Sequence, residues 1–217
     1  MMKPFLRNHH YNLIRKQVNL LQQTINTVSD TKVVESVRLG VHARILGALN
    51  DTDPVQRSLA DSAAELKTPE QFAHYLQTAE LYLEAFPSLT GKQLDKLFPK
   101  VKKLKAPDPS GIDFRRVTYL GWHDIAMNRM FLVYHMDGRC IGIEGRYTAS
   151  RKGVCFACNR HEDIVLFSAV QQKRPANAQP EYYKAIGNYL CADSAVCNNN
   201  ITDVTAIERF VREVAGC

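Results

Sequence analysis

A chain of 217 residues, 45% hydrophobic and 23% charged, is typical of a globular protein with one large domain or two smaller ones. It contains no run of 18 apolar residues, and its first 16 residues lack the apolar core of a secretory signal. Composition therefore excludes a transmembrane segment and predicts a cytoplasmic protein. The net charge of +6 arises after residue 85, because the first 85 residues carry nine basic and nine acidic side chains.

Residues 1–99 show the periodicity of amphipathic helices and predict an antiparallel helical bundle. Apolar residues alternate at spacings of four and three over residues 14–28, and a second stripe covers residues 34–45. Asp53 and Thr68 are each followed by proline, so each is the expected N-cap of a further helix.

A short helix capped by Thr90 is expected to close this bundle near Phe98. The turn-rich string KAPDPSG follows at residues 105–111. We therefore place a boundary over residues 100–111 and a second domain over residues 112–217.

The second half reads as mixed strand and helix, which gives an α+β chain overall. The string GWHDIAMNR at 121–129 predicts a short helix or turn, and the Asp-Gly dipeptide at 137–138 predicts a hairpin. Residues 164–170 and 182–191 are strand candidates, and an apolar stripe over 204–214 predicts a closing helix.

Four of the six cysteines form two close pairs, Cys155 with Cys158 and Cys191 with Cys197. Four thiolates suit tetrahedral zinc, and in a reducing compartment paired cysteines are better metal ligands than disulfides. A redox C-x-x-C normally opens a helix, whereas β-branched residues follow here, so structural zinc is favoured over a redox pair or unliganded core cysteines. A zinc knuckle, a hairpin and a closing helix together suggest a treble clef.

His161 is a possible substitute ligand, although a solvated loop histidine is the plainer interpretation. Cys140 and Cys217 have no close partner, and Cys140 lies in a strand-like pattern typical of core. The chain has no phosphate-binding loop, nucleophile elbow or H-E-x-x-H motif. A site closed by four thiolates leaves no open position for substrate, so we expect a structural metal and no enzyme.

Residues 92–105 carry six lysines and one aspartate. Such a run attracts acidic partners, although a solvated lysine face is an equally good interpretation. Nucleic acid and a ribosome-associated partner both remain open, but Phe98 alone is a poor platform for stacking bases.

The strings LFPKVKKLKAP, GWHDIAMNR, KGVCFACNR and YLCADSAVCNNNITD occur in this order. From about residue 10 onward the chain resembles the elongation factor G-binding proteins, which include the fusidic acid resistance proteins of the FusB type. The resemblance implies a helical N-terminal domain, a C-terminal treble-clef zinc domain, and non-enzymatic binding of elongation factor G that helps the factor leave a fusidic acid-trapped ribosome. It implies one zinc ion held by the same four cysteines, because position 196, a histidine in some relatives, is valine here.

The alternative function is a zinc-finger protein that binds nucleic acid or ribosomal RNA, as suggested by the sequence pI of about 9.0. For a protein partner, aromatic and basic side chains near the zinc ligands are the expected anchors, with core packing as the competing interpretation of each aromatic. These candidates are Phe156, Tyr182, Tyr183, Lys184 and Phe210.

Overall fold

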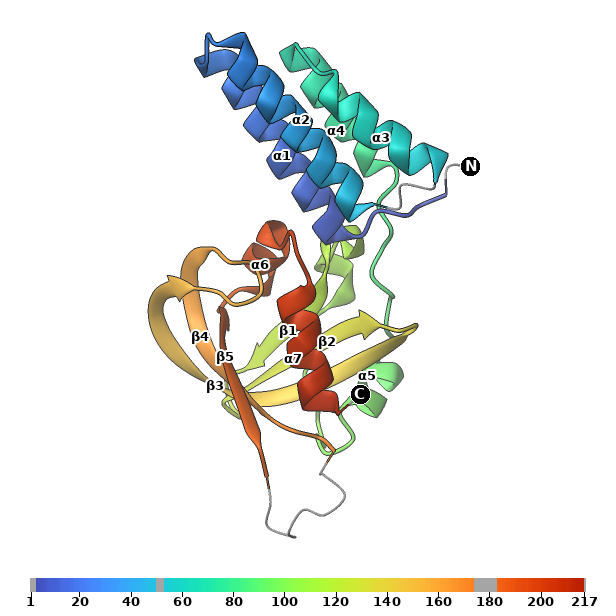
Figure 1. Cartoon of the computed structure of the whole chain (residues 1–217). Coiled ribbons are helices and arrows are strands. Elements are labelled where there is room, and N and C mark those ends of the chain that lie inside the picture. Colours follow the sequence, from blue (N-terminus) through green and yellow to red (C-terminus); the bar gives the residue numbers. More distant parts are fainter. Residues whose placement is uncertain (1–2, 50–52, 174–182, 217) are drawn as a thin grey trace. The chain divides into compact units, whose positions relative to one another are not determined.

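The computed structural model describes residues 3–49, 53–173 and 183–216, which form two compact units divided between residues 84 and 85 (Figure 1). Among these residues, no helix is both long enough and apolar enough to cross a membrane. Helices make up the first unit, whereas the second combines an antiparallel sheet with helices, which confirms the α+β class.

Helices with well-defined N-caps build the first unit. The Asp53 side chain accepts hydrogen bonds from the backbone amides of Val55 and Gln56, and Thr68 and Gln71 form a reciprocal capping box. Both predicted caps are therefore confirmed. The described part of this unit contains α1 (Asn8–Thr27), α2 (Thr31–Ala48), α3 (Pro54–Ala64) and α4 (Pro69–Glu80).

The apolar stripes of these helices form one core. Ile14, Val18 and Leu21 of α1 are buried with Val41 and Ile45 of α2, as the predicted stripes require. A parallel bridge between residues 6 and 83 joins the two ends of the unit. The core therefore depends on packing between consecutive helices and on the bridge that joins the two ends of the unit.

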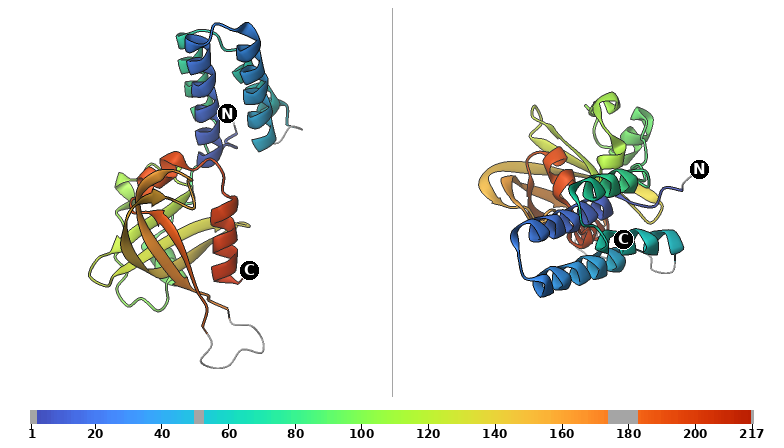
Figure 2. Two further views of the ribbon diagram at one scale, coloured as in Figure 1. Left: turned by 60° about the vertical axis from the view of Figure 1, so that its left-hand side comes forward. Right: turned by 90° about the horizontal axis from the view of Figure 1, so that it is seen from above.

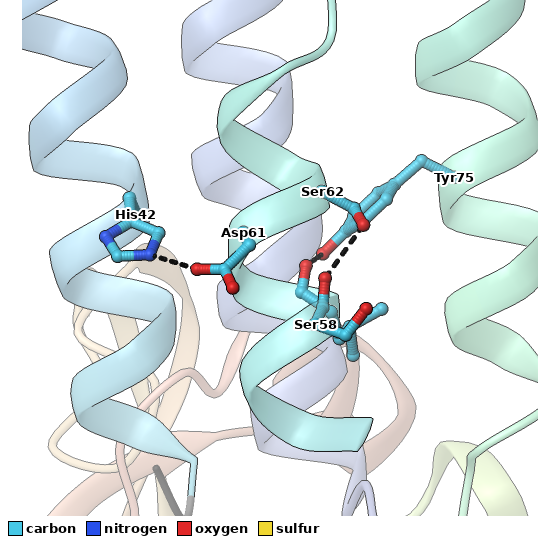
Figure 3. A network of polar contacts seen from close by, with 6 residues as sticks. His42, Ser58, Asp61, Ser62 and Tyr75 are labelled. Carbon is cyan, nitrogen blue, oxygen red and sulfur yellow. Dashed lines mark hydrogen bonds and ion pairs between the residues drawn. The ribbon is translucent and has the colours of Figure 1, made fainter. Parts of the chain in front are cut away.

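Polar contacts on two faces of α3 connect it to its neighbours (Figure 3). On one face, Nε2 of His42 in α2 lies 2.8 Å from Oδ1 of Asp61. On the other, the Tyr75 hydroxyl of α4 donates to the Leu59 carbonyl at 2.9 Å, and the Ser62 hydroxyl donates to a carbonyl of its own helix. The serine hydroxyl and the His42–Asp61 pair thus lie on different faces of α3 and form no Ser-His-Asp relay.

The second unit contains a five-stranded antiparallel meander in sequence order. Asp137 and Gly138, at φ 53° and 73°, join the second and third strands, which confirms the predicted hairpin. The expected helix or turn at 121–129 is wrong over its first half, because the chain pairs there with the following strand. The strands are β1 (Tyr119–Asp124), β2 (Arg129–Met136), β3 (Arg139–Val154), β4 (His161–Val170) and β5 (Ala185–Cys191).

Both faces of the sheet are covered. Alternate β2 residues such as Leu132 and Tyr134 join the core formed with α7 (Thr205–Ala215), which lies along one face of the sheet (Figures 1 and 2). The intervening residues, Phe131 and Val133, belong to a separate core on the other face. β2 is therefore apolar at nearly every position, unlike a strand with one solvated face.

The short helix expected to close the N-terminal bundle belongs instead to the second unit. This helix, α5 (Gly91–Leu97), is capped by Thr90 as predicted. Phe98, directly after it, places its ring 5.1 Å from that of Phe131 and 5.7 Å from that of Trp122. The chain therefore divides between residues 84 and 85 rather than over 100–111, because the sheet supplies the apolar partner for this helix.

Gly142 of β3 marks the tightest contact between the sheet and α5. A Cβ atom there would lie 2.9 Å from both the Leu97 Cβ and the Phe98 ring. We expect Gly142→Ala to lower the free energy of unfolding of the second unit by about 1–3 kcal/mol through overpacking. Trp122, the sole tryptophan, reports this in denaturant titrations followed by fluorescence.

Gly40 of α2 provides the matched control, because no atom lies within 4 Å of a Cβ added there. Gly40→Ala should leave the Trp122 transition unchanged and stabilise its helix by about 0.5–1 kcal/mol. A Gly142→Ala transition that coincides with wild type would contradict the assignment of α5 to the sheet.

Candidate metal centre

Four cysteine sulfurs from separate segments meet inside the second unit. Cys155 and Cys158 come from the turn between β3 and β4, Cys191 ends β5, and Cys197 lies in α6 (Ser194–Asn200). All four side chains are buried, and their Sγ atoms lie within 4.8 Å of one another. The predicted ligands are therefore brought together from positions up to 42 residues apart.

The spacing of the sulfurs fits a tetrahedral metal. Sγ of Cys155 lies 3.7 Å from Sγ of Cys197, and Sγ of Cys158 lies 3.6 Å from Sγ of Cys191. These distances exceed a disulfide bond of about 2.05 Å. A zinc ion with Zn–S bonds of about 2.3 Å holds its four sulfurs roughly 3.8 Å apart. The four cysteines thus match a closed, all-thiolate site.

Crowding of the thiols gives a second reason to expect a cation. Hydrogen bonds from Cys158, Cys191 and Cys197 lower the pKa of Cys155. The hydrogen bonds with Cys155 raise the pKa of Cys191 and of Cys197, because one thiolate can form only if its neighbours keep their protons. Four adjacent thiolates need a divalent cation to offset their repulsion, and the donor set therefore fits zinc.

The turn that carries Cys155 and Cys158 is fixed by backbone hydrogen bonds. The Cys155 amide donates to the Arg160 carbonyl and the Asn159 amide to the Cys155 carbonyl, each at 2.9 Å. Asn159 has φ 54°, a left-handed conformation that asparagine tolerates. β4 follows this turn, so the pair does not open a helix as a redox C-x-x-C does.

A set of side-chain contacts attaches α6 to β1, and we call it the α6–β1 clamp. Asn198 Oδ1 accepts from the amides of Thr118 and Tyr119 at 2.8 and 3.1 Å, and its Nδ2 donates to the Tyr119 carbonyl at 2.9 Å. The Ser194 hydroxyl donates to the Gly121 carbonyl at 2.8 Å. The clamp holds the helix that carries Cys197, and only the run of three asparagines marked this place in the sequence.

The other candidate ligands lie apart from the four sulfurs. His161 is exposed as the first residue of β4 and is not in the cluster of possible ligands. Cys140 is half-buried in β3 on the face that packs against α5, and burial raises its pKa. Cys217 lies outside the described residues.

Two of the five predicted partner anchors pack in or against the core. Phe210 is only 3% exposed, and its ring lies 5.8 Å from that of Phe167 in the core. Phe156 is partly buried, with its ring 5.5 Å from that of Phe210. The prediction of a surface side chain is wrong for Phe210, because the core beside the metal site recruits its ring, whereas a role of the partly buried Phe156 in partner binding stays a prediction.

The basic and tyrosine candidates lie at the surface. Tyr183 is 74% exposed, and the ammonium group of Lys184 forms an exposed ion pair with Glu213 of α7 at 2.7 Å. Tyr182 lies outside the described residues. A role for these side chains in binding a partner stays a prediction.

Two family models match the chain in sequence order. The model of the elongation factor G-binding protein N-terminal domain matches residues 5–87, and the model of the FBP C-terminal treble-clef zinc-finger matches residues 99–213. The second match includes all four clustered cysteines. The metal centre is therefore a structural zinc site.

The fold also resembles that of a solved structure, described as the fusidic acid resistance protein FusC. The two chains are 27% identical, with a TM-score of 0.78, over 96% of this chain and 97% of that one. No curated protein is significantly similar to this chain in sequence.

Replacement of any ligand should release the metal and unfold the second unit alone. We expect Cys158→Ser or Cys197→Ser to reduce zinc content from one equivalent to well below half, because structural zinc supplies much of the folding free energy of small domains. Elemental analysis measures the zinc, and Trp122 fluorescence reports unfolding.

Cys140→Ser is the matched control, since this cysteine lies outside the cluster. It should keep the full zinc content and the wild-type fluorescence transition. Zinc-free wild-type protein after purification without chelator is the result that contradicts the assignment.

Proposed function

The chain belongs to the elongation factor G-binding protein family, and from this premise we propose that it uses its second unit to help the factor leave the ribosome in the presence of fusidic acid. The observation that supports this most is the order of the two family matches, which together span almost the whole chain. The resemblance to a fusidic acid resistance protein over both units supports it further. In this role the protein acts in the cytoplasm.

The zinc site favours binding because it keeps a surface rigid. The metal joins the β3–β4 turn, the end of β5 and α6, three segments that share a core with α7. A preorganised surface loses little conformational entropy when it binds a partner. The excess of positive charge after residue 85 adds a long-range attraction for acidic partner surfaces.

We infer that protection comes from binding, without chemical change to the drug. Four thiolates leave no coordination position for a substrate, and the Ser62 hydroxyl donates within its own helix rather than to the His42–Asp61 pair. Fusidic acid incubated with the protein and the factor should therefore keep its mass and retention time in liquid chromatography with mass spectrometry. A modified drug would overturn this inference.

Tyr183 and Lys184 are the two candidate anchors whose exposed side chains can be truncated without removing core packing. We expect Tyr183→Ala or Lys184→Ala to weaken binding to elongation factor G by at least about tenfold, as truncation of interface hot spots does. Calorimetry measures the affinity, and zinc content and Trp122 fluorescence should match wild type. Phe156→Ala is less informative, because it also removes packing against Phe210.

Glu213→Gln is the control for Lys184, because it breaks the ion pair and keeps the lysine. If Lys184 contacts the partner directly, Glu213→Gln should bind with the wild-type affinity. If the ion pair only holds the local surface in place, Glu213→Gln should bind as weakly as Lys184→Ala. Normal binding by both Tyr183→Ala and Lys184→Ala would place the interface elsewhere.

Release of the factor is tested by sedimentation. Ribosomes carrying factor, GTP and fusidic acid should lose factor from the pellet when wild-type protein is added, and much less when Lys184→Ala is added. If the amount of factor in the pellet does not change although the protein still binds free factor, the protein binds the factor without releasing it, and the proposed release is wrong.

Binding of ribosomal RNA is the second candidate, and one observation favours it. The six lysines of residues 92–105 are all exposed, while the apolar residues between them face the core. Lys102→Gln combined with Lys103→Gln should reduce the salt dependence of ribosome binding if RNA is the partner. Under the leading proposal this double variant associates with elongation factor G more slowly, because two positive charges are lost, but keeps the dissociation rate of wild type.

A further inference from the structure

One buried hydroxyl in the core that holds the sulfur cluster has no hydrogen-bond partner among the described residues. Tyr119 of β1 is 0% exposed, and its hydroxyl oxygen forms no hydrogen bond with the described residues, sulfur atoms included. Burial raises the pKa of Tyr119 well above its ordinary value. Tyr119 is buried in the same core as the four cysteines, and its ring lies beside α6, because a Cβ added at Gly121 would meet both this ring and the Cβ of Ser194.

The backbone around Tyr119 is fixed relative to Cys197. Asn198, the residue after this ligand, binds both the amide and the carbonyl of Tyr119 through its side chain. The ring also packs closely over Gly121, where an added Cβ would lie only 2.7 Å from its Cε2 atom. The backbone of Tyr119 and the edge of its ring are therefore both held in place next to α6.

We propose that Tyr119 is a positioning residue of the zinc centre, whose hydroxyl donates a hydrogen bond to the Cys197 sulfur when this sulfur is a metal-bound thiolate. A buried hydroxyl without a partner is unfavourable, and a thiolate accepts hydrogen bonds far better than a thiol. Zinc binding thus provides Tyr119 with its acceptor, and Tyr119 in turn orients Cys197. Such outer partners change metal affinity by about 10- to 100-fold.

Tyr134 provides a matched control on the adjacent strand. It pairs with Tyr119 in the register of β1 and β2, is 2% exposed, and belongs to the same core. Its hydroxyl donates to Oε1 of Glu208 at 2.9 Å and therefore has a partner away from the metal. Tyr134→Phe removes a comparable buried hydroxyl without touching a zinc ligand.

The test measures zinc transfer from the full-length, zinc-loaded protein to an excess of a chromogenic chelator. We expect Tyr119→Phe to release zinc about tenfold faster than wild type, and Tyr134→Phe to stay within about twofold. In the cobalt-substituted protein, the thiolate-to-metal charge-transfer band should shift to lower energy in Tyr119→Phe alone, because one thiolate has lost a hydrogen bond.

Two results would overturn the proposal. The first is a Tyr119→Phe protein with the release rate and cobalt spectrum of wild type. The second is equal acceleration in Tyr119→Phe and Tyr134→Phe with unshifted cobalt bands, because this result means that either change merely loosens the core. Neither outcome depends on whether the protein binds elongation factor G.

Discussion

The second unit depends on four sulfurs that only a shared metal ion can hold together. The meander itself connects neighbouring strands through local turns, so it does not by itself attach the β3–β4 turn to α6. Zinc makes this connection and fixes the end of β5 at the same point. Structural zinc binding contributes about 10–16 kcal/mol in small domains, comparable with the whole stability of many proteins.

The sheet separates this metal-dependent core from a second core that needs no metal. On one face, α7 and the zinc ligands pack with Leu132 and Phe167. On the other face, α5 and Phe98 pack with Trp122 and Phe131. β1 and β2 each contribute residues to both cores, so the two cores share these strands.

The sequence predicted correctly those features that depend on a few neighbouring residues. The cysteine pairs, the caps at Asp53 and Thr68, and the Asp137-Gly138 turn depend on residues close in sequence, and all were found as expected. The strand at 119–124 was missed because its pairing with β2 overrides a string rich in polar residues.

Two other predictions were wrong for different reasons. The apolar face of α7 was taken to be narrower than it is, and the surface on which α5 packs was not known. Phe210 follows Ile207 by three positions and precedes Val214 by four, so it lies within the wide apolar face of α7 rather than beside it. The apolar residues of α5 indicate that one face of this helix is buried. Their spacing cannot show whether that face packs against the N-terminal helices or against the sheet. The role of Asn198 was likewise invisible, since its partners are backbone groups about 80 residues away.

The α6–β1 clamp also protects an edge of the sheet. Outer strands present unpaired amides and carbonyls on which strands of other molecules can assemble. Asn198 and Ser194 occupy such groups at Thr118, Tyr119 and Gly121. Because the helix that covers this edge also carries Cys197, the zinc site and the clamp support each other, and we expect loss of zinc to weaken the cover over these edge groups.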